Sequence, residues 1–191
     1  MPTIYVCFLE NDTELMEAHI LNKMASMLAP KAEHGSPKIH VELFFPNKSS
    51  SYNNDVLEGK ACSIYYGGKV FLVQKKFSRK QWSFRKLDVN ANQYDKIYDY
   101  CNKHVGDGFN HLSYFTYPVN CQQITPYWPT HFGGRPKYFC SEICVEALKA
   151  GNVIDKDSHS SIHPQQLFAL LKEDSTPDCV RNYDNMKLSF A

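Results

Sequence analysis

The segment "KIHVELFF", residues Lys38–Phe45, decides how the rest of the chain is interpreted. Its β-branched, aliphatic and aromatic residues predict a β-strand. Side chains alternate between the two faces of a strand, so the aliphatic residues at positions 39, 41 and 43 share one face. His40 and Glu42 share the other face. The segment therefore predicts both part of a sheet and a candidate functional site.

Strands and helices are predicted on both sides of this segment. A hairpin turn is expected at Gly67–Gly68, and Pro164 suits the first turn of a helix. The order is strand, helix, several strands and then helices, which predicts an α+β fold with an antiparallel sheet and segregated helices. The predicted strands are Thr3–Glu10, Lys38–Phe45, two within Ala61–Phe77, and Gln81–Val89; the predicted helices follow residues 11–13, span Asn90–Gly108 and Cys140–Ala150, and begin near Pro164.

The whole chain, residues 1–191, is expected to form one domain. A polar surface loop is predicted at about residues 46–60 and an irregular tail from about residue 175. The section Phe109–Lys137 has no regular pattern but is rich in aromatic residues and proline, which predicts an ordered, winding connection.

The formal net charge is only +1, so no overall basic field points to nucleic acid and no overall acidic field points to a charged partner. Residues Gln74–Lys86 form a local basic cluster that alternates with apolar residues. This alternation favours the solvated faces of strands, so no nucleic-acid partner is expected. The competing hypothesis, nucleic-acid binding by this cluster, predicts affinity that falls steeply with salt concentration.

The seven cysteines include no C-x-x-C pair, which disfavours a disulfide framework and a zinc ribbon. The N-terminus becomes polar too early for a signal peptide, and no apolar run approaches the length of a transmembrane segment. We therefore expect a soluble protein of a reducing compartment such as the cytoplasm, or the host cytoplasm or virion if the chain is viral. The oligomeric state is left open.

A second segment, "KYFCSEICVEALKAG" (Lys137–Gly151), places Cys140 where a helix should begin. An apolar stripe follows at helical spacing, so Cys140 faces inward at the first turn. One interpretation is a small core residue, as expected for Cys144 one turn later. The other is a reactive thiolate, because the unpaired N–H groups at a helix start favour negative charge.

The strand segment supports the second interpretation. His40 and Glu42 are two residues apart on one strand face, so their Cα atoms lie roughly 6.5–7 Å from each other. The carboxylate can orient the imidazole and favour its protonated form. A thiol at a helix start beside a histidine and an orienting acid is the arrangement of a papain-like cysteine hydrolase.

Three stretches carry a family resemblance. "HVELFF", then "YFCSEICVEAL" and finally "HPQQLFALL" resemble the circularly permuted branch of the NlpC-type papain-like cysteine peptidase superfamily. In that branch the histidine strand precedes the cysteine helix. It includes bacterial, eukaryotic and poxvirus members and is related to lecithin retinol acyltransferase. The resemblance covers roughly His40 to Leu171 and implies a permuted papain-like fold.

By this resemblance Cys140 is the nucleophile and His40 is the base. The third position varies within the family between an acid, an amide and a second histidine. Glu42 is preferred because it shares a strand face with His40, and Ser63 and Tyr65 are the alternatives. The backbone N–H of Cys140 would meet the oxyanion.

The predicted function is hydrolysis of an amide, ester or thioester by a thiol peptidase or amidase. Peptides, isopeptides, lipid amides and acyl groups all suit this chemistry, which requires no metal and no organic cofactor. With a second nucleophile in place of water, the same triad gives an acyltransferase. The remaining alternative is an inactive papain-like scaffold with a binding or structural role.

Other candidates have weaker support. His131 could line the cleft, since its segment leads into Cys140. A metal site built from the two helix cysteines with His40 and Glu42 is disfavoured, because C-x-x-x-C is not a usual zinc spacing. Aromatic residues near the cysteine helix either line an apolar groove or pack the winding section onto the sheet: Tyr114, Phe115, Tyr117, Tyr127, Trp128, Phe132, Tyr138 and Phe139.

Overall fold

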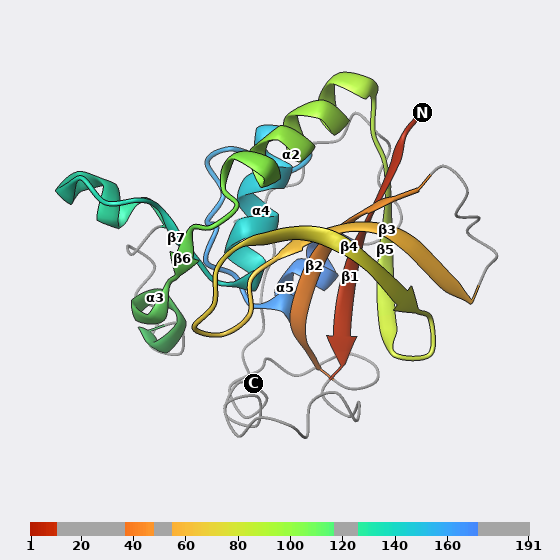
Figure 1. Cartoon of the computed structure of the whole chain (residues 1–191), viewed down its shortest axis with the longest axis horizontal. Coiled ribbons are helices and arrows are strands. Elements are labelled where there is room, and N and C mark those ends of the chain that lie inside the picture. Colours follow the sequence, from red (N-terminus) through yellow and green to blue (C-terminus); the bar gives the residue numbers. More distant parts are fainter. Residues whose placement is uncertain (11–36, 48–54, 117–125, 172–191) are drawn as a thin grey trace.

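An antiparallel sheet of five strands forms the centre of the structure (Figure 1). The computed structural model describes residues 1–10, 37–47, 55–116 and 126–171. The strand order is β4-β3-β2-β1-β5, so β2, which carries the candidate site, is central. The strands are β1 (Thr3–Glu10), β2 (Lys38–Pro46), β3 (Val56–Ser63), β4 (Phe71–Ser78) and β5 (Trp82–Asp88).

The sheet is strongly curved because its two edge strands are neighbours along the chain. β4 and β5 lie at opposite ends of the strand order, yet only residues 79–81 connect them. Their side chains meet over one face of the sheet, where the ring centroid of Phe77 lies 4.8 Å from that of Trp82 and 6.4 Å from that of Phe84. A small cluster fills this inner face: Tyr5, Cys7, Phe44, Leu57, Ala61 and Phe77.

Helices cover the opposite face of the sheet (Figure 1). They are α2 (Ala91–Lys103), α4 (Cys140–Ala150) and α5 (Pro164–Leu170). Buried side chains of all three helices pack against the apolar residues of β1 and β2 that point toward this face, and together they form one large core. Between α2 and α4 the chain forms β6 (Gly108–Phe109), α3 (His111–Thr116), the 3₁₀ helix η3 (Trp128–Phe132) and β7 (Lys137–Tyr138), and β6 pairs with β7 in parallel.

Local sequence explains where the covering helices begin. The Asn90 side chain accepts from the Gln93 N–H at 2.9 Å and fixes the start of α2. At α5, the His163 Nδ1 accepts from the Gln165 N–H at 3.1 Å. Burial lowers the pKa of His163 to about 3, so this imidazole is neutral and can act as an acceptor.

The α+β class and the antiparallel sheet predicted from the sequence are confirmed. So are the four predicted strand regions and the helices that begin at Ala91, Cys140 and Pro164. The predicted helix after residues 11–13 and the tail from about residue 175 lie outside the described residues. The extent of one domain over residues 1–191 stays a prediction.

Two expectations were partly wrong. The predicted loop at about residues 46–60 is too long, because β3 already begins at Val56. Exposed and buried residues alternate from Val56 to Ala61, and the polar residues on the exposed face gave this strand the composition of a loop. The section Phe109–Lys137 was expected to lack regular structure, but it contains α3, η3 and the short pair of β6 and β7.

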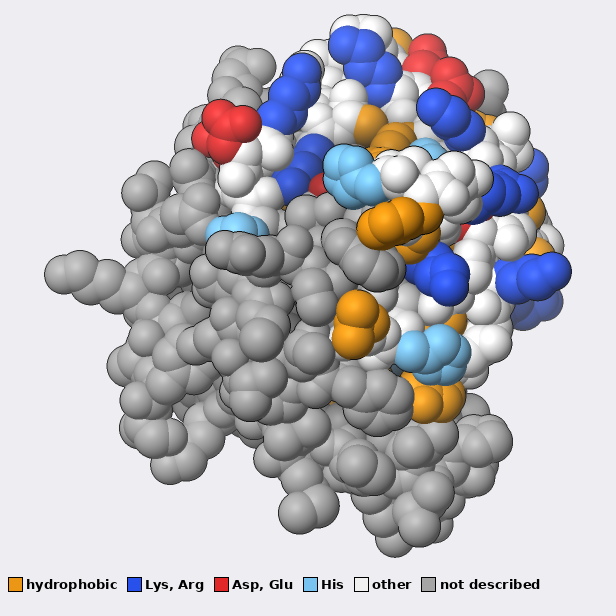
Figure 2. All heavy atoms as spheres, turned by 90° about the vertical axis from the view of Figure 1, so that its left-hand side faces the viewer, with side chains coloured by type: hydrophobic (Ala, Val, Ile, Leu, Met, Phe, Trp, Pro, Cys, Tyr) orange, Lys and Arg blue, Asp and Glu red, His pale blue; other side chains and the backbone are white. Residues whose placement is uncertain are grey.

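No helix in the described part of the chain is sufficiently long and apolar to span a membrane. On the side of the molecule that carries α3 and η3, the hydrophobic side chains of the described residues form small, separate groups among Lys, Arg and His (Figure 2). Exposed apolar residues that are scattered in this way are normal for a protein surface.

The close approach of β3 to β2 predicts that Gly59→Ala destabilises the fold. A Cβ atom at this position would lie 2.2 Å from the Phe45 carbonyl oxygen and 2.8 Å from the Pro46 Cα, so backbone must move. We expect the free energy of unfolding, measured with urea, to fall by about 2–3 kcal/mol.

Gly108→Ala is the matched control, because a Cβ at Gly108 would have its nearest neighbour, the Lys137 Cγ, at 4.0 Å. This substitution should change the free energy of unfolding by about 0.5 kcal/mol or less. Equal effects of the two substitutions on the free energy of unfolding would contradict the close approach of β3 to β2 at Gly59.

Candidate active site

His40 and Glu42 contact each other on β2, as the alternation of strand side chains predicts. The His40 Nε2 lies 3.2 Å from the Glu42 Oε1. Glu42 has no exposed side-chain surface, and the His40 side chain is 15% exposed. Because Nε2 contacts the carboxylate, Nδ1 is the ring nitrogen that remains for another partner.

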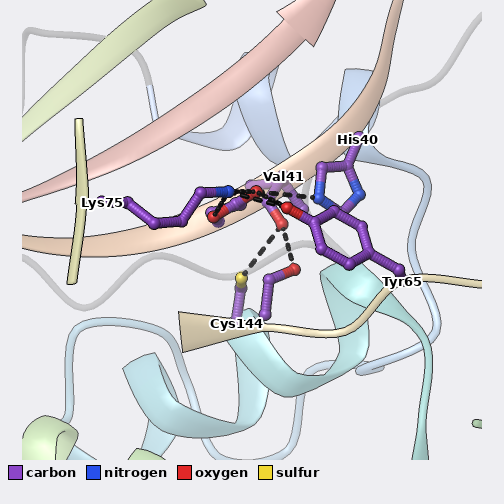
Figure 3. Close-up of polar contacts among 7 residues, drawn as sticks. His40, Val41, Tyr65, Lys75 and Cys144 are labelled. Atoms are coloured by element: carbon purple, nitrogen blue, oxygen red, sulfur yellow. Dashed lines mark hydrogen bonds and ion pairs between the residues drawn. The ribbon is translucent and has the colours of Figure 1, made fainter. Parts of the chain in front are cut away.

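The Glu42 carboxylate also binds a lysine from β4 (Figure 3). The Lys75 Nζ donates to Oε1 at 2.7 Å and to Oε2 at 2.9 Å. The Tyr65 hydroxyl lies 3.4 Å from Oε1 and accepts from the Lys75 Nζ at 2.8 Å. The Tyr65 ring also stacks on the His40 imidazole, with centroids 5.4 Å apart. A buried carboxylate is thus surrounded by an imidazole, an ammonium group and a phenol.

Cys140 is the first residue of α4 and is partly exposed. Its side chain lies close enough to His40 to raise the pKa of the imidazole. One turn along the helix, the Cys144 thiol lies 3.9 Å from the carbonyl oxygen of Val41 (Figure 3). This contact packs α4 against β2 directly beside His40.

The thiol and the imidazole come from opposite faces of the sheet. Val41 belongs to the core under the helices, whereas His40 stacks on Tyr65 and lies 6.3 Å from the Trp82 ring on the inner face. β2 pairs with β3 only over Leu43–Pro46. The two strands are therefore not paired beside His40, and Cys140 at the start of α4 lies near the imidazole at this gap in the pairing.

Protonated His40 is stabilised by its two partners. Burial alone would lower the pKa of His40, but interactions with Cys140 and with Glu42 raise it to about 9. Burial would likewise raise the pKa of Glu42, yet contacts with His40 and Lys75 lower it overall. At neutral pH the site therefore holds an imidazolium next to an ionised carboxylate.

The backbone in front of Cys140 is anchored by Glu142, which is fully buried. Its Oε2 accepts from the Phe139 N–H at 2.9 Å and from the Asn110 Nδ2 at 3.2 Å. Its Oε1 accepts from the Ser161 hydroxyl. One carboxylate thus ties the helix start to the end of β6 and to the loop before α5.

The structure distinguishes the three candidates for the orienting group. Glu42 is hydrogen-bonded to a nitrogen of His40. The Ser63 hydroxyl instead donates to the Val41 carbonyl at 2.7 Å, away from the imidazole. Tyr65 contacts the imidazole through its ring face and binds Glu42 through its hydroxyl. Of the three, Glu42 has the geometry of an orienting acid.

The other predicted residues lie in different surroundings. His131 is exposed on η3, which extends away from α4 (Figure 1). Cys144 is a fully buried core residue, and burial raises the pKa of its thiol. Among the described residues, no group of three or more His, Cys, Asp or Glu side chains is placed to hold a metal ion.

Some of the aromatic residues expected near the cysteine helix do lie beside it. Tyr114 packs between Tyr66 and Phe139, with ring centroids 5.5 Å and 6.3 Å away. Burial and the nearby charge of Cys140 raise the pKa of Tyr114 to about 12, so its phenol stays protonated at neutral pH.

Other aromatic residues of this set do not line an open groove. Tyr138 has no exposed surface and its hydroxyl lies 2.9 Å from that of Tyr100, which also contacts Tyr127. Phe132 is 75% exposed on η3. Three further side chains lie outside the described residues: Phe115, Tyr117 and Trp128.

Sequence reasoning missed Lys75 and Glu142. Lys75 lies within the basic cluster that was expected to be solvated, but its side chain is directed inward to Glu42. Its neighbour Lys76 is 71% exposed and pairs with Glu58, as a solvated strand face predicts. The sequence did contain one indication: Lys75 is two residues from Phe77, so both side chains point to the same strand face, and Phe77 is buried. Glu142 does not belong to the apolar stripe of its helix, so its burial could not be recognised from the periodicity.

No protein-family model matches this chain, and no curated protein or solved structure shows significant similarity to it. Its function is therefore inferred from the contacts of the site itself.

The His40 contacts predict an unusually basic histidine. In ¹⁵N-histidine NMR titrations, His40 should titrate near pH 9, whereas His163 should stay neutral down to about pH 3. Both Cys140→Ala and Glu42→Gln should lower the pKa of His40, because each removes a partner of the imidazolium. A titration midpoint for His40 at the ordinary histidine pKa of 6.5 would refute these contacts.

The same shift has a consequence for stability. The pKa of His40 is higher in the folded chain, about 9, than its ordinary value of 6.5. Its contribution is thus fully present below about pH 6.5 and is lost as pH rises through about 9. Cys140→Ala should flatten this part of the stability profile, measured by urea unfolding between these pH values.

The three donors at Glu142 predict that Glu142→Gln lowers the free energy of unfolding. The amide presents N–H groups where an acceptor is required, and a buried unsatisfied group should cost about 2 kcal/mol. Glu58→Gln is the control, since Glu58 is 48% exposed in its pair with Lys76 and should contribute about 0–1 kcal/mol. A Glu142→Gln protein as stable as this control would contradict an anchoring role.

Proposed function

We propose that the protein is a cysteine-dependent hydrolase, of peptidase or amidase type, with Cys140 as nucleophile, His40 as base and Glu42 as orienting acid. One observation carries this proposal: the imidazole of His40 contacts a thiol at a helix start and a buried carboxylate. A thiol, a base in reach and a third group that orients the base constitute an activated nucleophile.

The contacts supply each step of acyl transfer. Cys140 gives its proton to His40, and the sulfur attacks the carbonyl carbon of an amide, ester or thioester. The imidazolium then protonates the leaving group, and a bound acyl thioester remains on Cys140. Water attacks this thioester and gives a proton to His40, and the acid leaves as the sulfur of Cys140 is released as a thiolate beside protonated His40.

The start of α4 can stabilise the negative oxygen of the tetrahedral intermediate. The first N–H groups of a helix have no partner within the helix, and that of Cys140 is the first in α4. An oxyanion beside the sulfur would be within reach of this group and of the positive end of the helix dipole. Glu142, which fixes the residue before Cys140, would keep this N–H in place.

The resting charge state supports the same chemistry. With a pKa of about 9, His40 is protonated at neutral pH. Glu42 is ionised, since its pKa is lowered. The imidazolium is therefore ready to protonate a leaving group.

We infer a permuted papain-like architecture for this domain. A histidine strand in a curved antiparallel sheet precedes a cysteine helix that packs against it, and this order supports the resemblance noted in the sequence. Substrates would be peptides, isopeptides or acyl compounds such as lipid amides. All five cysteines in the described residues are free thiols, which suits a reducing compartment.

The proposal predicts that iodoacetamide modifies Cys140 faster than any other cysteine at pH 7. His40→Gln should slow this reaction about 100-fold, because the thiol loses the base that activates it. Peptide mapping by mass spectrometry would assign the modified residue, which matters because Cys121 and Cys179 lie outside the described residues.

His131→Gln is the matched control, since it removes an exposed histidine on η3. It should leave the rate at Cys140 unchanged. Greater exposure alone would also favour labelling of Cys140, so the dependence on His40 is decisive. Equal rates in the wild-type and His40→Gln proteins would contradict an enzyme and support a binding or structural scaffold.

A further inference from the structure

Lys75 makes both hydrogen bonds and ring contacts beside the candidate site. Its ammonium group donates to both oxygens of Glu42, at 2.7 Å and 2.9 Å, and to the Tyr65 hydroxyl at 2.8 Å. Its Nζ also lies 5.2–5.8 Å from the centroids of four rings, those of Tyr65, Phe71, Phe77 and Trp82. Only 22% of its side chain is exposed.

This position favours the charged form of both partners. Burial alone would lower the pKa of Lys75, but its contacts with Glu42 and Tyr65 raise it. The ring faces add cation–π attraction for the ammonium group. Lysine and carboxylate therefore stay ionised together, and two hydrogen bonds fix the plane of the carboxylate.

We propose that Lys75 is a positioning residue of this site, which acts on His40 through the Glu42 carboxylate that it binds. This role rests on the proposed function. The site is then a chain of four groups, Cys140, His40, Glu42 and Lys75. Lys75 does not touch the sulfur; it determines how strongly the carboxylate attracts the imidazolium.

The charges that face His40 come from several elements. α4 supplies Cys140, β2 supplies Glu42, and β4 supplies Lys75 next to that carboxylate. Two further titratable groups nearby are neutral at pH 7, because burial raises the pKa of Cys7 on β1 and that of Tyr65. The ionised Glu42 carboxylate thus lies between two cations, protonated His40 and Lys75.

In this arrangement Lys75 and His40 share one carboxylate. Without Lys75, the imidazolium of His40 is the remaining cation that contacts Glu42. The loss of the lysine also removes a nearby positive charge that repels the imidazolium. The proton on His40 is then held more tightly. A more basic imidazolium is a weaker general acid, so Lys75 would adjust the acidity of the group that protonates the leaving group.

The test is Lys75→Met, which keeps an unbranched side chain only one heavy atom shorter and removes its charge. Histidine NMR should show the pKa of His40 above its wild-type value of about 9. Iodoacetate is an anionic reagent that the imidazolium attracts, so its reaction with Cys140 should slow when His40 loses its proton at alkaline pH. In Lys75→Met this decrease in rate should occur at correspondingly higher pH. Lys76→Met is the matched control, because Lys76 is the next residue and is 71% exposed; it should leave both readouts unchanged.

A double-mutant cycle tests whether Lys75 acts through Glu42. In a Glu42→Gln background, Lys75→Met should shift the pKa of His40 by less than half as much. Lys75→Gln repeats the series if Lys75→Met does not fold. An unchanged or lower pKa of His40 in Lys75→Met, or an equal shift in both backgrounds, would overturn the proposal.

The outcomes separate this inference from the proposed function. A shift of the His40 pKa in Lys75→Met, with no His40-dependent reactivity of Cys140, would support the positioning role and contradict a hydrolase. His40-dependent reactivity without that shift would support the hydrolase and overturn the role of Lys75.

Discussion

Glu42 carries a charge in a position without any exposed side-chain surface. An ionised carboxylate in such a place is stable only when paired and hydrogen-bonded. His40 comes from the same strand, Lys75 from β4, and Tyr65 from the connection between β3 and β4. The contacts of this one carboxylate therefore link β2 to β4 and to the connection that precedes β4. They also determine the orientation of the imidazole, so packing of the sheet and arrangement of the site depend on the same contacts.

The curvature of the sheet and the gap between β2 and β3 allow groups from its two faces to meet. The helix start reaches the gap because α4 packs on the outer core, with Cys144 against the Val41 carbonyl. His40 reaches it from the inner face. Glu142 then holds the backbone before Cys140 through donors from two other segments. The thiol is fixed by buried contacts on one side, and the imidazole by a charged pair on the other.

Much of the fold was predictable because strand and helix patterns are local. Runs of β-branched, aliphatic and aromatic residues identified β1 and β2, and the glycine pair identified the turn between β3 and β4. The start of β3 was missed because its exposed residues are polar and resemble a loop. In the candidate site, the contact of His40 with Glu42 followed from a spacing of two residues. Lys75 could not be separated from the other basic residues of its cluster, because its partner lies two strands away in the sheet.

The sequence by itself determined what depends on neighbours along the chain. It placed His40 beside Glu42 on one strand face and Cys140 at the first turn of an apolar helix. Only the tertiary structure decided that these two segments meet, and that Lys75 rather than Lys76 is directed to the carboxylate. The physical reason is that such contacts depend on strand order, register and curvature. Those features result from the packing of the whole core, in which residues as distant as Val41 and Cys144 come together.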